Sequence, residues 1–232
     1  MVCRKGVFFC FLVAMRALSA FQRGGVSSIR SCVAVNASSG KKKKKQMQQE
    51  QERSEFSWPR LVVFDLDNTV WNPELYMLGR RPVANKDIYL CEGSAAALRE
   101  LWEAEVAGAV ASRTHRGDLA EELLDVFEVS PGLSLSRVLP HREIYTGSKR
   151  KHFQNLQKKT GVPYSEMLFF DDWTQNLADV TQLGVLSIHT PRGLTTNLWR
   201  GGLRAYAALK QQNTTFMGRM LTSADLTESF LP

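Results

Sequence analysis

The sequence predicts an α/β protein, a Rossmann-like three-layer sandwich in which helices cover both faces of a central parallel sheet. Two observations support this prediction. From Trp58 onward, short apolar runs alternate with amphipathic segments of about ten to fifteen residues. Apolar runs such as Leu-Val-Val-Phe at 61–64 end abruptly in polar residues. Strands that alternate with helices of this length favour βαβ units, whose strands run parallel to one another.

The first half of this domain contains two predicted strands and two predicted helices. The run 61–64 is entirely apolar, so we expect a strand that is buried on both faces. Residues 94–105, SAAALRELWEAE, have apolar positions at helical spacing, with Ser94 as the expected N-cap. The apolar run 107–111 predicts the next strand, and the amphipathic segment 119–127 predicts the next helix.

The second half continues this alternation. The predicted strands are 142–145, 167–170 and 185–188, and the predicted helices are 149–159, 177–183 and 198–210. Gly161 and Pro163 end the basic helix at 149–159, and Gly184 ends the helix that precedes the last strand. The tail after Gln212 shows little periodicity and receives no assignment.

Composition divides the chain into five parts. These are a signal-peptide-like segment at 1–20, a transit-peptide-like segment at 21–40, a linker rich in Lys and Gln at 41–57, a folded domain at 58–212 and an unassigned tail at 213–232. The apolar stretch 6–15 is too short to span a bilayer, and the small residues Ser19 and Ala20 suit signal peptidase. We therefore expect no stable membrane span in the mature protein.

The leader predicts a destination for the chain. A signal-like start is followed by a segment rich in Ser and Arg and free of acids, with Phe21 just after the expected cleavage point. This arrangement resembles the bipartite leaders of plastids bounded by extra membranes in algae of the diatom type. We expect a plastid protein on this basis. A mitochondrial leader and a plain secretory signal remain open, because leader classes overlap in composition.

The net charge of +7 belongs to the leader rather than to the domain. Residues 1–49 contain ten Lys or Arg and no Asp or Glu, which leaves 20 basic and 23 acidic residues, a net charge of −3, over 50–232. The Lys run at 41–45 has no interleaved aromatic residues, so it offers only salt-sensitive, non-specific attraction to nucleic acid. We expect a monomer with no specific nucleic-acid partner. A basic nucleic-acid-binding protein that uses this run remains an alternative.

Cysteine and histidine do not indicate a metal site in the domain. Cys91 is the only cysteine beyond residue 32, so neither a disulfide nor a Cys-rich zinc site supports the fold, and we expect a partly buried, inert thiol. The four histidines share no ligand spacing. Of these, His115 is expected to line the entrance to a site near the end of the second strand.

Polar residues follow three of the predicted strands. The residues concerned are Asp65, Asp67 and Thr69 after the first strand, Ser112, Arg113 and Thr114 after the second, and Asp171 and Asp172 after 167–170. Lys149 opens the helix that follows Tyr-Thr-Gly-Ser. Ligands of such sheets bind in the crevice beyond the carboxyl ends of the strands. We therefore expect these side chains to converge at one edge of the sheet.

Four short motifs occur in order at these positions: DLDNT at 65–69, ASRT at 111–114, GSK at 147–149 and FFDD at 169–172. They resemble the four motifs of the haloacid dehalogenase superfamily, and more closely its magnesium-dependent phosphatase-1 branch. The resemblance covers about residues 58–210 and includes Trp71 and the stretch 142–172. It implies a phosphatase that uses Mg²⁺.

The resemblance and the chemistry of phosphoryl transfer together assign roles to the acidic residues. Asp65 is the expected nucleophile, which forms an aspartyl phosphate, and Asp67 is the expected general acid and base. The expected Mg²⁺ ligands are the Asp65 side chain, the Asp67 main-chain oxygen and one of the pair that ends the fourth motif. We favour Asp172 as that ligand, with Asp171 orienting Lys149, and keep Asp171 as the alternative ligand.

The remaining site residues are expected to act on the substrate. Ser112 and Arg113 would contact its anionic groups, and Lys149 would neutralise phosphate charge and restrain Asp65. On the basis of the resemblance, Trp71 is also expected to bind substrate. Taken one at a time, these residues have simpler explanations, such as aspartates that cap a turn, a solvated lysine or a surface arginine. Their joint occurrence in family order favours a catalytic site.

The segment 71–91 is long for a simple connection and short for a second domain. We expect a small flap rather than a full cap domain, and an open site that admits phosphate groups carried by small molecules or protein side chains. The expected function is phosphomonoester hydrolysis. The resemblance implies phosphotyrosine and other aryl phosphates, or fructosamine phosphates on protein, as substrates. A non-catalytic binding domain remains an alternative, because a fold does not fix a function.

Overall fold

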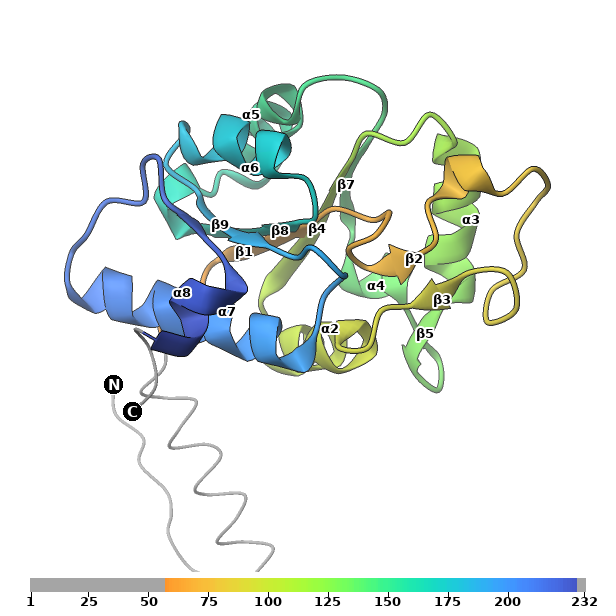
Figure 1. Cartoon of the computed structure of the whole chain (residues 1–232), viewed down its shortest axis with the longest axis horizontal. Coiled ribbons are helices and arrows are strands. Elements are labelled where there is room, and N and C mark those ends of the chain that lie inside the picture. The colour runs from red at the N-terminus through yellow and green to blue at the C-terminus, as the bar shows by residue number, and fades with distance from the viewer. Residues whose placement is uncertain (1–56, 229–232) are drawn as a thin grey trace, which may run out of the picture. The chain divides into compact units, whose positions relative to one another are not determined.

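A computed structural model describes residues 57–228, which build a six-stranded parallel sheet between two layers of helices (Figure 1). The strand order is β10-β9-β8-β1-β4-β7. The strands are β1 (Leu61–Phe64), β4 (Ala107–Ser112), β7 (His141–Ile144), β8 (Met167–Asp171), β9 (Leu186–His189) and β10 (Met220–Leu221). Every pairing between neighbours is parallel. The predicted α/β class and its central parallel sheet are confirmed.

Strand β1 lies in the interior of the sheet, between β8 and β4. Val63 is paired with Ala109 on one side and with Phe169 on the other. All four side chains of β1 are fully buried. The strand is apolar at every position because a central strand of a parallel sheet meets no water on either face.

Helices cover both faces of the sheet and divide its core in two. The helices are α2 (Ser94–Glu103) and α7 (Thr196–Gln211) on one face and α5 (Lys149–Thr160) and α6 (Thr174–Thr181) on the other (Figure 1). Leu61 and Val63 pack with Phe153 in the core beneath α5 and α6. Val62 and Phe64 join the other core, which α2 and α7 cover. Successive side chains of a strand point to opposite faces of the sheet, so β1 contributes to the cores under both helix layers.

Two short elements between α3 (Gly117–Val126) and β7 were not predicted from the sequence. They are an antiparallel hairpin of β5 (Glu128–Ser130) and β6 (Leu133–Ser134) and the one-turn helix α4 (Leu135–Val138). Gly132 in the hairpin turn has a φ of 77° and follows Pro131, so the Pro-Gly pair was an available turn signal. A further one-turn 3₁₀ helix, η2 (Tyr164–Glu166), leads into β8.

The segment 71–91 is a small flap that has no core of its own. It consists of the antiparallel pair β2 (Trp71–Asn72) and β3 (Tyr89–Leu90) and the 3₁₀ turn η1 (Leu75–Met77). It carries several exposed large apolar side chains, namely Tyr76, Met77, Val83 and Tyr89. The segment is therefore a small flap, as predicted, and not a full cap domain.

The start of α2 differs from the prediction. Gly93, rather than Ser94, occupies the N-cap, and the Ser94 hydroxyl donates a 2.8 Å hydrogen bond to the Val70 carbonyl. A Cβ atom on Gly93 would lie 2.4 Å from the Thr195 carbonyl carbon. Glycine is therefore required where the α2 N-terminus meets the start of α7, and Ser94 ties α2 to the loop that follows β1.

The C-terminal tail adds to the sheet. Residues 220–221 form β10, which pairs with β9 through Leu221 and Ile188, and α8 (Ser223–Glu228) follows. The sequence prediction left this region unassigned because a two-residue strand is too short to show periodicity. Leu221 and Leu226 of these elements join the same core as α7.

The predicted signal and transit segments, and the predicted linker at 41–57 except its last residue, lie outside the described residues. Within residues 57–228, no helix has both the length and the apolar character needed to cross a bilayer.

Candidate active site

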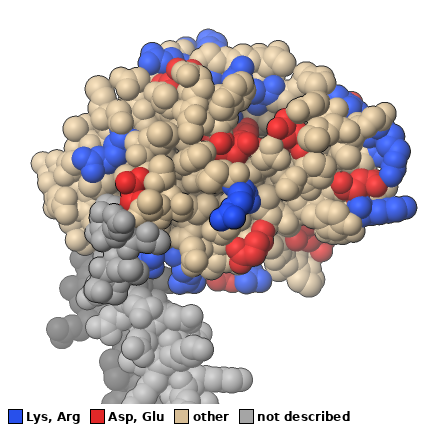
Figure 2. All heavy atoms as spheres, in the orientation of Figure 1, with Lys and Arg blue, Asp and Glu red and all other residues tan. Residues whose placement is uncertain are grey.

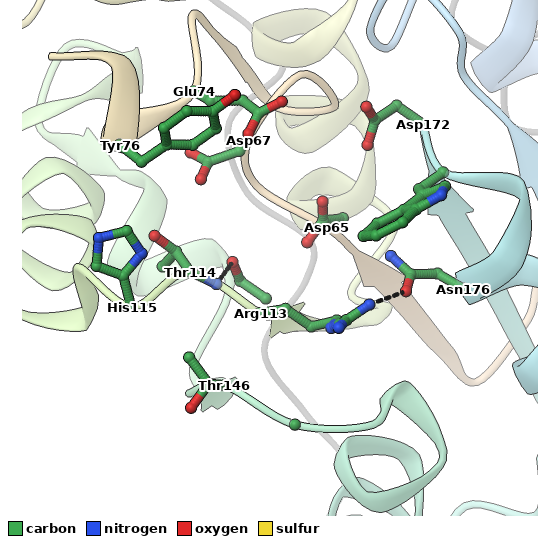
Figure 3. Close-up of a pocket in the computed structure, with 13 residues that line it drawn as sticks. Asp65, Asp67, Glu74, Tyr76, Arg113, Thr114, His115, Thr146, Asp172 and Asn176 are labelled. Atoms are coloured by element: carbon green, nitrogen blue, oxygen red, sulfur yellow. Dashed lines mark hydrogen bonds between the residues drawn. The ribbon is translucent and has the colours of Figure 1, made fainter.

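A cavity of about 570 Å³ opens at the carboxyl ends of β1, β4 and β8 (Figure 3). The residues that line it are Asp65, Asp67, Glu74, Tyr76, Ser112, Arg113, Thr114, His115, Thr146, Gly147, Asp172, Trp173 and Asn176. Figure 3 shows Asp65 in the middle, with Asp67 and Tyr76 on one side and Asp172 and Asn176 on the other. Figure 2 shows acidic side chains at the middle of this face. The polar residues that end three separate strands therefore meet at the predicted edge of the sheet.

Lys149 lies beneath the cavity, with its ammonium group directed at protein oxygens. Its Nζ atom is 2.7 Å from Asp65 Oδ1 and 2.9 Å from Asp171 Oδ2, and it also donates to the Ala111 carbonyl. The residue is 1% exposed, so it is not a solvated helix residue. An ammonium group has three hydrogens, and these three acceptors leave none for a substrate phosphate. Lys149 therefore acts through its charge and by holding Asp65.

Trp71 does not reach the cavity, which corrects the expectation that it binds substrate. Its side chain is fully buried, and its indole Nε1 donates a 2.7 Å hydrogen bond to Asp67 Oδ1. The backbone N–H of Leu75 points at the same oxygen, at 3.4 Å. Both donors approach Oδ1, the Thr114 side chain also hydrogen-bonds the Asp67 carboxylate, and Asp67 lines the cavity. Trp71 therefore orients Asp67 and cannot touch a ligand.

The two adjacent aspartates of the fourth motif have different surroundings. Asp171 is fully buried and accepts hydrogen bonds from the Trp173 N–H, at 2.7 Å, and from Asn176 Nδ2, at 3.1 Å to each oxygen, beside its ion pair with Lys149. Asp172 is half-buried and lines the cavity. The hydrogen-bonding capacity of Asp171 is already used by the protein. Asp172 accepts a side-chain hydrogen bond from Asn68 and, unlike Asp171, lines the cavity.

Burial raises the pKa of three aspartates of the site, Asp65, Asp67 and Asp172. Burial is the largest cause of the raised pKa of Asp65. The charge of Lys149 lowers this pKa, and the charge of Asp171 raises it further. Burial, and then the charge of Asp171, raises the pKa of Asp172 to about 6. Burial also raises the pKa of Asp67 above that of an ordinary aspartate, while the bond from Trp71 opposes the shift. A general acid must hold its proton near neutral pH, and this environment favours that state in Asp67.

The same cluster fits a hard divalent cation. Carboxylate oxygens of Asp65, Asp171 and Asp172 lie within 4.8 Å of one another. Mg²⁺ prefers oxygen ligands and uses only one or two carboxylates besides water. Besides burial, the negative charge of Asp171 raises the pKa of both Asp65 and Asp172. A cation among these oxygens would offset that repulsion, so both the donor set and its electrostatics suit Mg²⁺.

Arg113 is held at the wall of the cavity by Asn176. Its Nη1 atom donates a 3.0 Å hydrogen bond to Asn176 Oδ1 (Figure 3), and its guanidinium carbon lies 5.1 Å above the centre of the Trp173 ring. Beside it, the Ser112 hydroxyl accepts a 3.3 Å hydrogen bond from the Thr114 N–H, and both residues line the cavity. A hydroxyl donor and a guanidinium donor thus share one wall, which suits a phosphate oxygen.

This geometry agrees with comparisons with known proteins. Residues 57–209 match the family described as acid phosphatase. The chain belongs to the acid phosphatase family. The matched region runs from the first described residue into the last turn of α7, so every residue of the cavity lies inside it.

Individual relatives are similar to this acid phosphatase domain. Magnesium-dependent phosphatase 1 of Homo sapiens is 39% identical over 160 residues, which cover 64% of this chain and 88% of that protein. A HAD-like hydrolase superfamily protein of Schizosaccharomyces pombe is 31% identical over 144 residues, or 55% of this chain and 83% of that protein. A crystal structure of a HAD-superfamily hydrolase from Ehrlichia chaffeensis aligns with a TM-score of 0.48 at 14% identity, over 66% of this chain and 98% of that chain.

Several residues of this acid phosphatase site were not predicted as site residues from the sequence. Asn176 lies in the first turn of α6, where it contacts both Asp171 and Arg113. An Asn four residues after the acidic pair, just before the predicted helix at 177–183, was the one signal that pointed to it. Glu74 and Tyr76 reach the cavity from the flap, where no sequence pattern indicated a role. His115 lies in the cavity lining, as predicted.

The structure also shows whether Asp172 caps a helix and what surrounds the Cys91 thiol. Trp173, rather than Asp172, occupies the N-cap of α6, so Asp172 does not cap that helix. Cys91 is a half-buried free thiol, and burial raises its pKa above that of an ordinary cysteine. A thiol with a raised pKa holds little thiolate, which agrees with the prediction of an inert cysteine.

Proposed function

We propose that this acid phosphatase domain hydrolyses phosphomonoesters with Mg²⁺ as cofactor, through an aspartyl phosphate on Asp65. The observation that carries the proposal is the position of Asp65 in the middle of the cavity, with Oδ1 held 2.7 Å from Lys149. The second oxygen, Oδ2, is then the oxygen that we assign to attack phosphorus. A carboxylate nucleophile splits one difficult displacement into two easier steps.

Asp67 gives up a proton in the first step and takes one back in the second, so the two steps together balance. In the first, Asp65 Oδ2 forms a bond to phosphorus while the ester P–O bond breaks, and the Asp67 carboxyl donates its proton to the departing oxygen. In the second, the Asp67 carboxylate takes a proton from water, whose oxygen attacks phosphorus and releases Asp65 and inorganic phosphate. The bond from Trp71 and the raised pKa of Asp67 support this dual role.

Three groups of this chain would hold the metal ion. These are the Asp65 side chain, the main-chain oxygen of Asp67 and the Asp172 side chain, with Asp171 as the alternative ligand. When bound, Mg²⁺ supplies positive charge that neutralises the phosphoryl oxygens. The name of the human relative, magnesium-dependent phosphatase 1, supports the choice of metal.

We propose that the substrates carry their phosphate on a larger group, such as phosphotyrosine, another aryl phosphate or a protein-bound fructosamine phosphate. The open cavity and the small flap support this choice, because neither encloses a leaving group. Ser112 and Arg113 line the wall where the phosphate would lie.

The decisive experiment measures hydrolysis by the purified full chain with and without Mg²⁺. The substrates are p-nitrophenyl phosphate, phosphotyrosine, sugar phosphates and fructosamine phosphates. We expect Mg²⁺-dependent turnover by the wild type and none by Asp65→Asn. A matched control, Asp125→Asn on the exposed side of α3, should retain full activity. Mg²⁺-dependent turnover by a folded Asp65→Asn protein would refute the nucleophile assignment.

We also propose a plastid as the destination of the chain, on the composition of residues 1–40 alone. The full chain fused at its C-terminus to a fluorescent protein tests this in a diatom-type alga. Fluorescence in mitochondria or in the secretory pathway would favour the corresponding alternative leader.

A further inference from the structure

The cavity has a single permanent cation among the described residues that line it. That cation is Arg113, because Lys149 lies beneath the floor with its three hydrogens bound to Asp65, Asp171 and the Ala111 carbonyl. A substrate phosphate carries up to two negative charges and needs directed donors. Within the described cavity, the charged donors available to it therefore come from Arg113.

The Arg113 side chain is held from two sides. Asn176 Oδ1 accepts a 3.0 Å hydrogen bond from Nη1, and the Trp173 ring lies 5.1 Å from the guanidinium carbon. Asn176 is itself fixed, because it is buried and its Nδ2 donates to both oxygens of Asp171 at 3.1 Å. The orientation of Arg113 is thus linked to the carboxylate that pairs with Lys149.

Trp173 has no evident structural duty besides this contact. Its side chain is 56% exposed, and it is the backbone N–H, not the ring, that binds Asp171. A similar pair, Arg137 over Trp102 at 5.5 Å, occurs outside the cavity, so stacking alone does not define a site. Only the Arg113 pair combines the ring with a buried amide and a position in the cavity lining.

We propose that Trp173 is a positioning residue that, together with Asn176, holds the Arg113 guanidinium ready to bind the phosphoryl group of the substrate. An unrestrained arginine has many rotamers, and ordering one on binding costs conformational entropy. The ring and the amide remove that cost in advance, and they leave Nε and Nη2 of Arg113 as a fork for two phosphate oxygens. This inference rests on the proposed function, because it assumes that the cavity binds phosphate.

The test measures binding of inorganic phosphate to the full-length protein by titration calorimetry with Mg²⁺ present, together with kcat and KM for p-nitrophenyl phosphate. Trp173→Ala should weaken phosphate binding and raise KM by about two- to fivefold, the size of an exposed cation–π contact, with kcat nearly unchanged. Trp173→Phe keeps a ring and should restore most of the binding. The matched control Trp102→Ala, which removes the ring of the other stacked pair, should change neither quantity.

A double-mutant cycle shows whether Trp173 acts through Arg113. Arg113→Met should weaken phosphate binding by about ten- to a hundredfold, because it removes charged hydrogen bonds. Adding Trp173→Ala to Arg113→Met should then have no further effect. Additive losses would overturn the proposal and mean that the ring touches the ligand directly. Unchanged phosphate affinity in Trp173→Ala alone would also overturn it.

The binding measurement separates this inference from the proposed function. Phosphate binding does not require turnover, so it can be repeated in the Asp65→Asn background. If Asp65→Asn remains active, the nucleophile assignment fails while the Trp173 result still stands. If phosphate binds equally well to wild type and Arg113→Met, the present inference fails while the nucleophile assignment still stands.

Discussion

The Lys149 ammonium lies 2.7 Å from Oδ1 of Asp65, and both residues are buried at the end of a fully apolar strand. The same nitrogen lies 2.9 Å from Asp171. Two buried carboxylates thus share one buried cation, which makes this network sensitive to the loss of any member. A buried ion pair that loses one partner leaves a charge without compensation.

Removing the cation should destabilise the protein and abolish its activity. For Lys149→Met we expect the free energy of unfolding to fall by about 3–5 kcal/mol, because Asp65 and Asp171 stay buried without their partner. Urea denaturation monitored by circular dichroism measures this loss. The double variant Lys149→Met/Asp171→Asn should recover part of it, because one orphaned charge is removed. A Lys149→Met protein as stable as wild type would contradict the role of the ion pairs.

The adjacent aspartates Asp171 and Asp172 should differ when each is replaced by Asn. Asp172→Asn should lower Mg²⁺ affinity by about tenfold or more, as measured by titration calorimetry, with little effect on unfolding. Asp171→Asn should mainly lower stability, because Lys149 and Asn176 lose a charged acceptor. The reverse pattern, with Mg²⁺ binding lost only in Asp171→Asn, would make Asp171 the ligand.

The Asp67 side chain should matter for proton transfer and not for metal binding. Asp67→Asn should lower kcat by about a hundredfold or more, the usual contribution of a general acid. Its Mg²⁺ affinity should stay close to that of wild type, because only the main-chain oxygen is assigned as a ligand. Titration with Mg²⁺ checks this, and a large loss of affinity would instead make the side chain a ligand.

Trp71 should affect catalysis through Asp67. Trp71→Phe removes the N–H that lies 2.7 Å from Asp67 Oδ1 and keeps an aromatic ring in the core. We expect kcat to fall more for an alkyl phosphate than for p-nitrophenyl phosphate, since a poor leaving group depends more on protonation. The matched control is Trp199→Phe, which removes another indole bond, to Glu100 at 2.9 Å, outside the cavity. Equal losses on both substrates would argue for a general packing effect.

The buried His152 should make stability depend on pH. Burial, followed by the charge of Lys149, lowers its pKa from 6.5 to about 4, and its Nε2 lies 3.1 Å from the Tyr145 carbonyl. Below pH 6.5 the unfolded chain gains a proton that the folded protein excludes, so stability falls as the pH drops toward 4. The loss amounts to about 2–3 kcal/mol.

Urea denaturation of wild type and His152→Gln at several pH values tests this. Gln keeps a donor for the Tyr145 carbonyl but cannot take up a proton. The stability difference between the two proteins should therefore shift in favour of the variant as the pH falls from 7 to 4.5. A difference that does not vary with pH would show that His152 does not titrate in this range.

The sequence was sufficient for the fold class and for the edge of the sheet that carries the site. Entirely apolar runs such as Leu61–Phe64 can be satisfied only in the interior of a sheet, and the polar residues that follow them must then lie at strand ends. Prediction from the sequence missed elements that are short or atypical, namely β10, the β5–β6 hairpin and α4. These elements are stabilised by contacts with the rest of the domain and are too short to show a periodicity of their own.

The sequence by itself determined that Asp65, Asp67, Lys149 and the Asp171–Asp172 pair would meet, because strand and helix spacing fixes where each lies along its own element. Only the tertiary structure decided which partner each side chain takes. It directed the three Lys149 donors onto Asp65, Asp171 and the Ala111 carbonyl and turned the Trp71 indole onto Asp67. It also brought Asn176 between Asp171 and Arg113. Hydrogen bonds depend on distances of a few tenths of an ångström and on direction, and packing between segments far apart in sequence sets both.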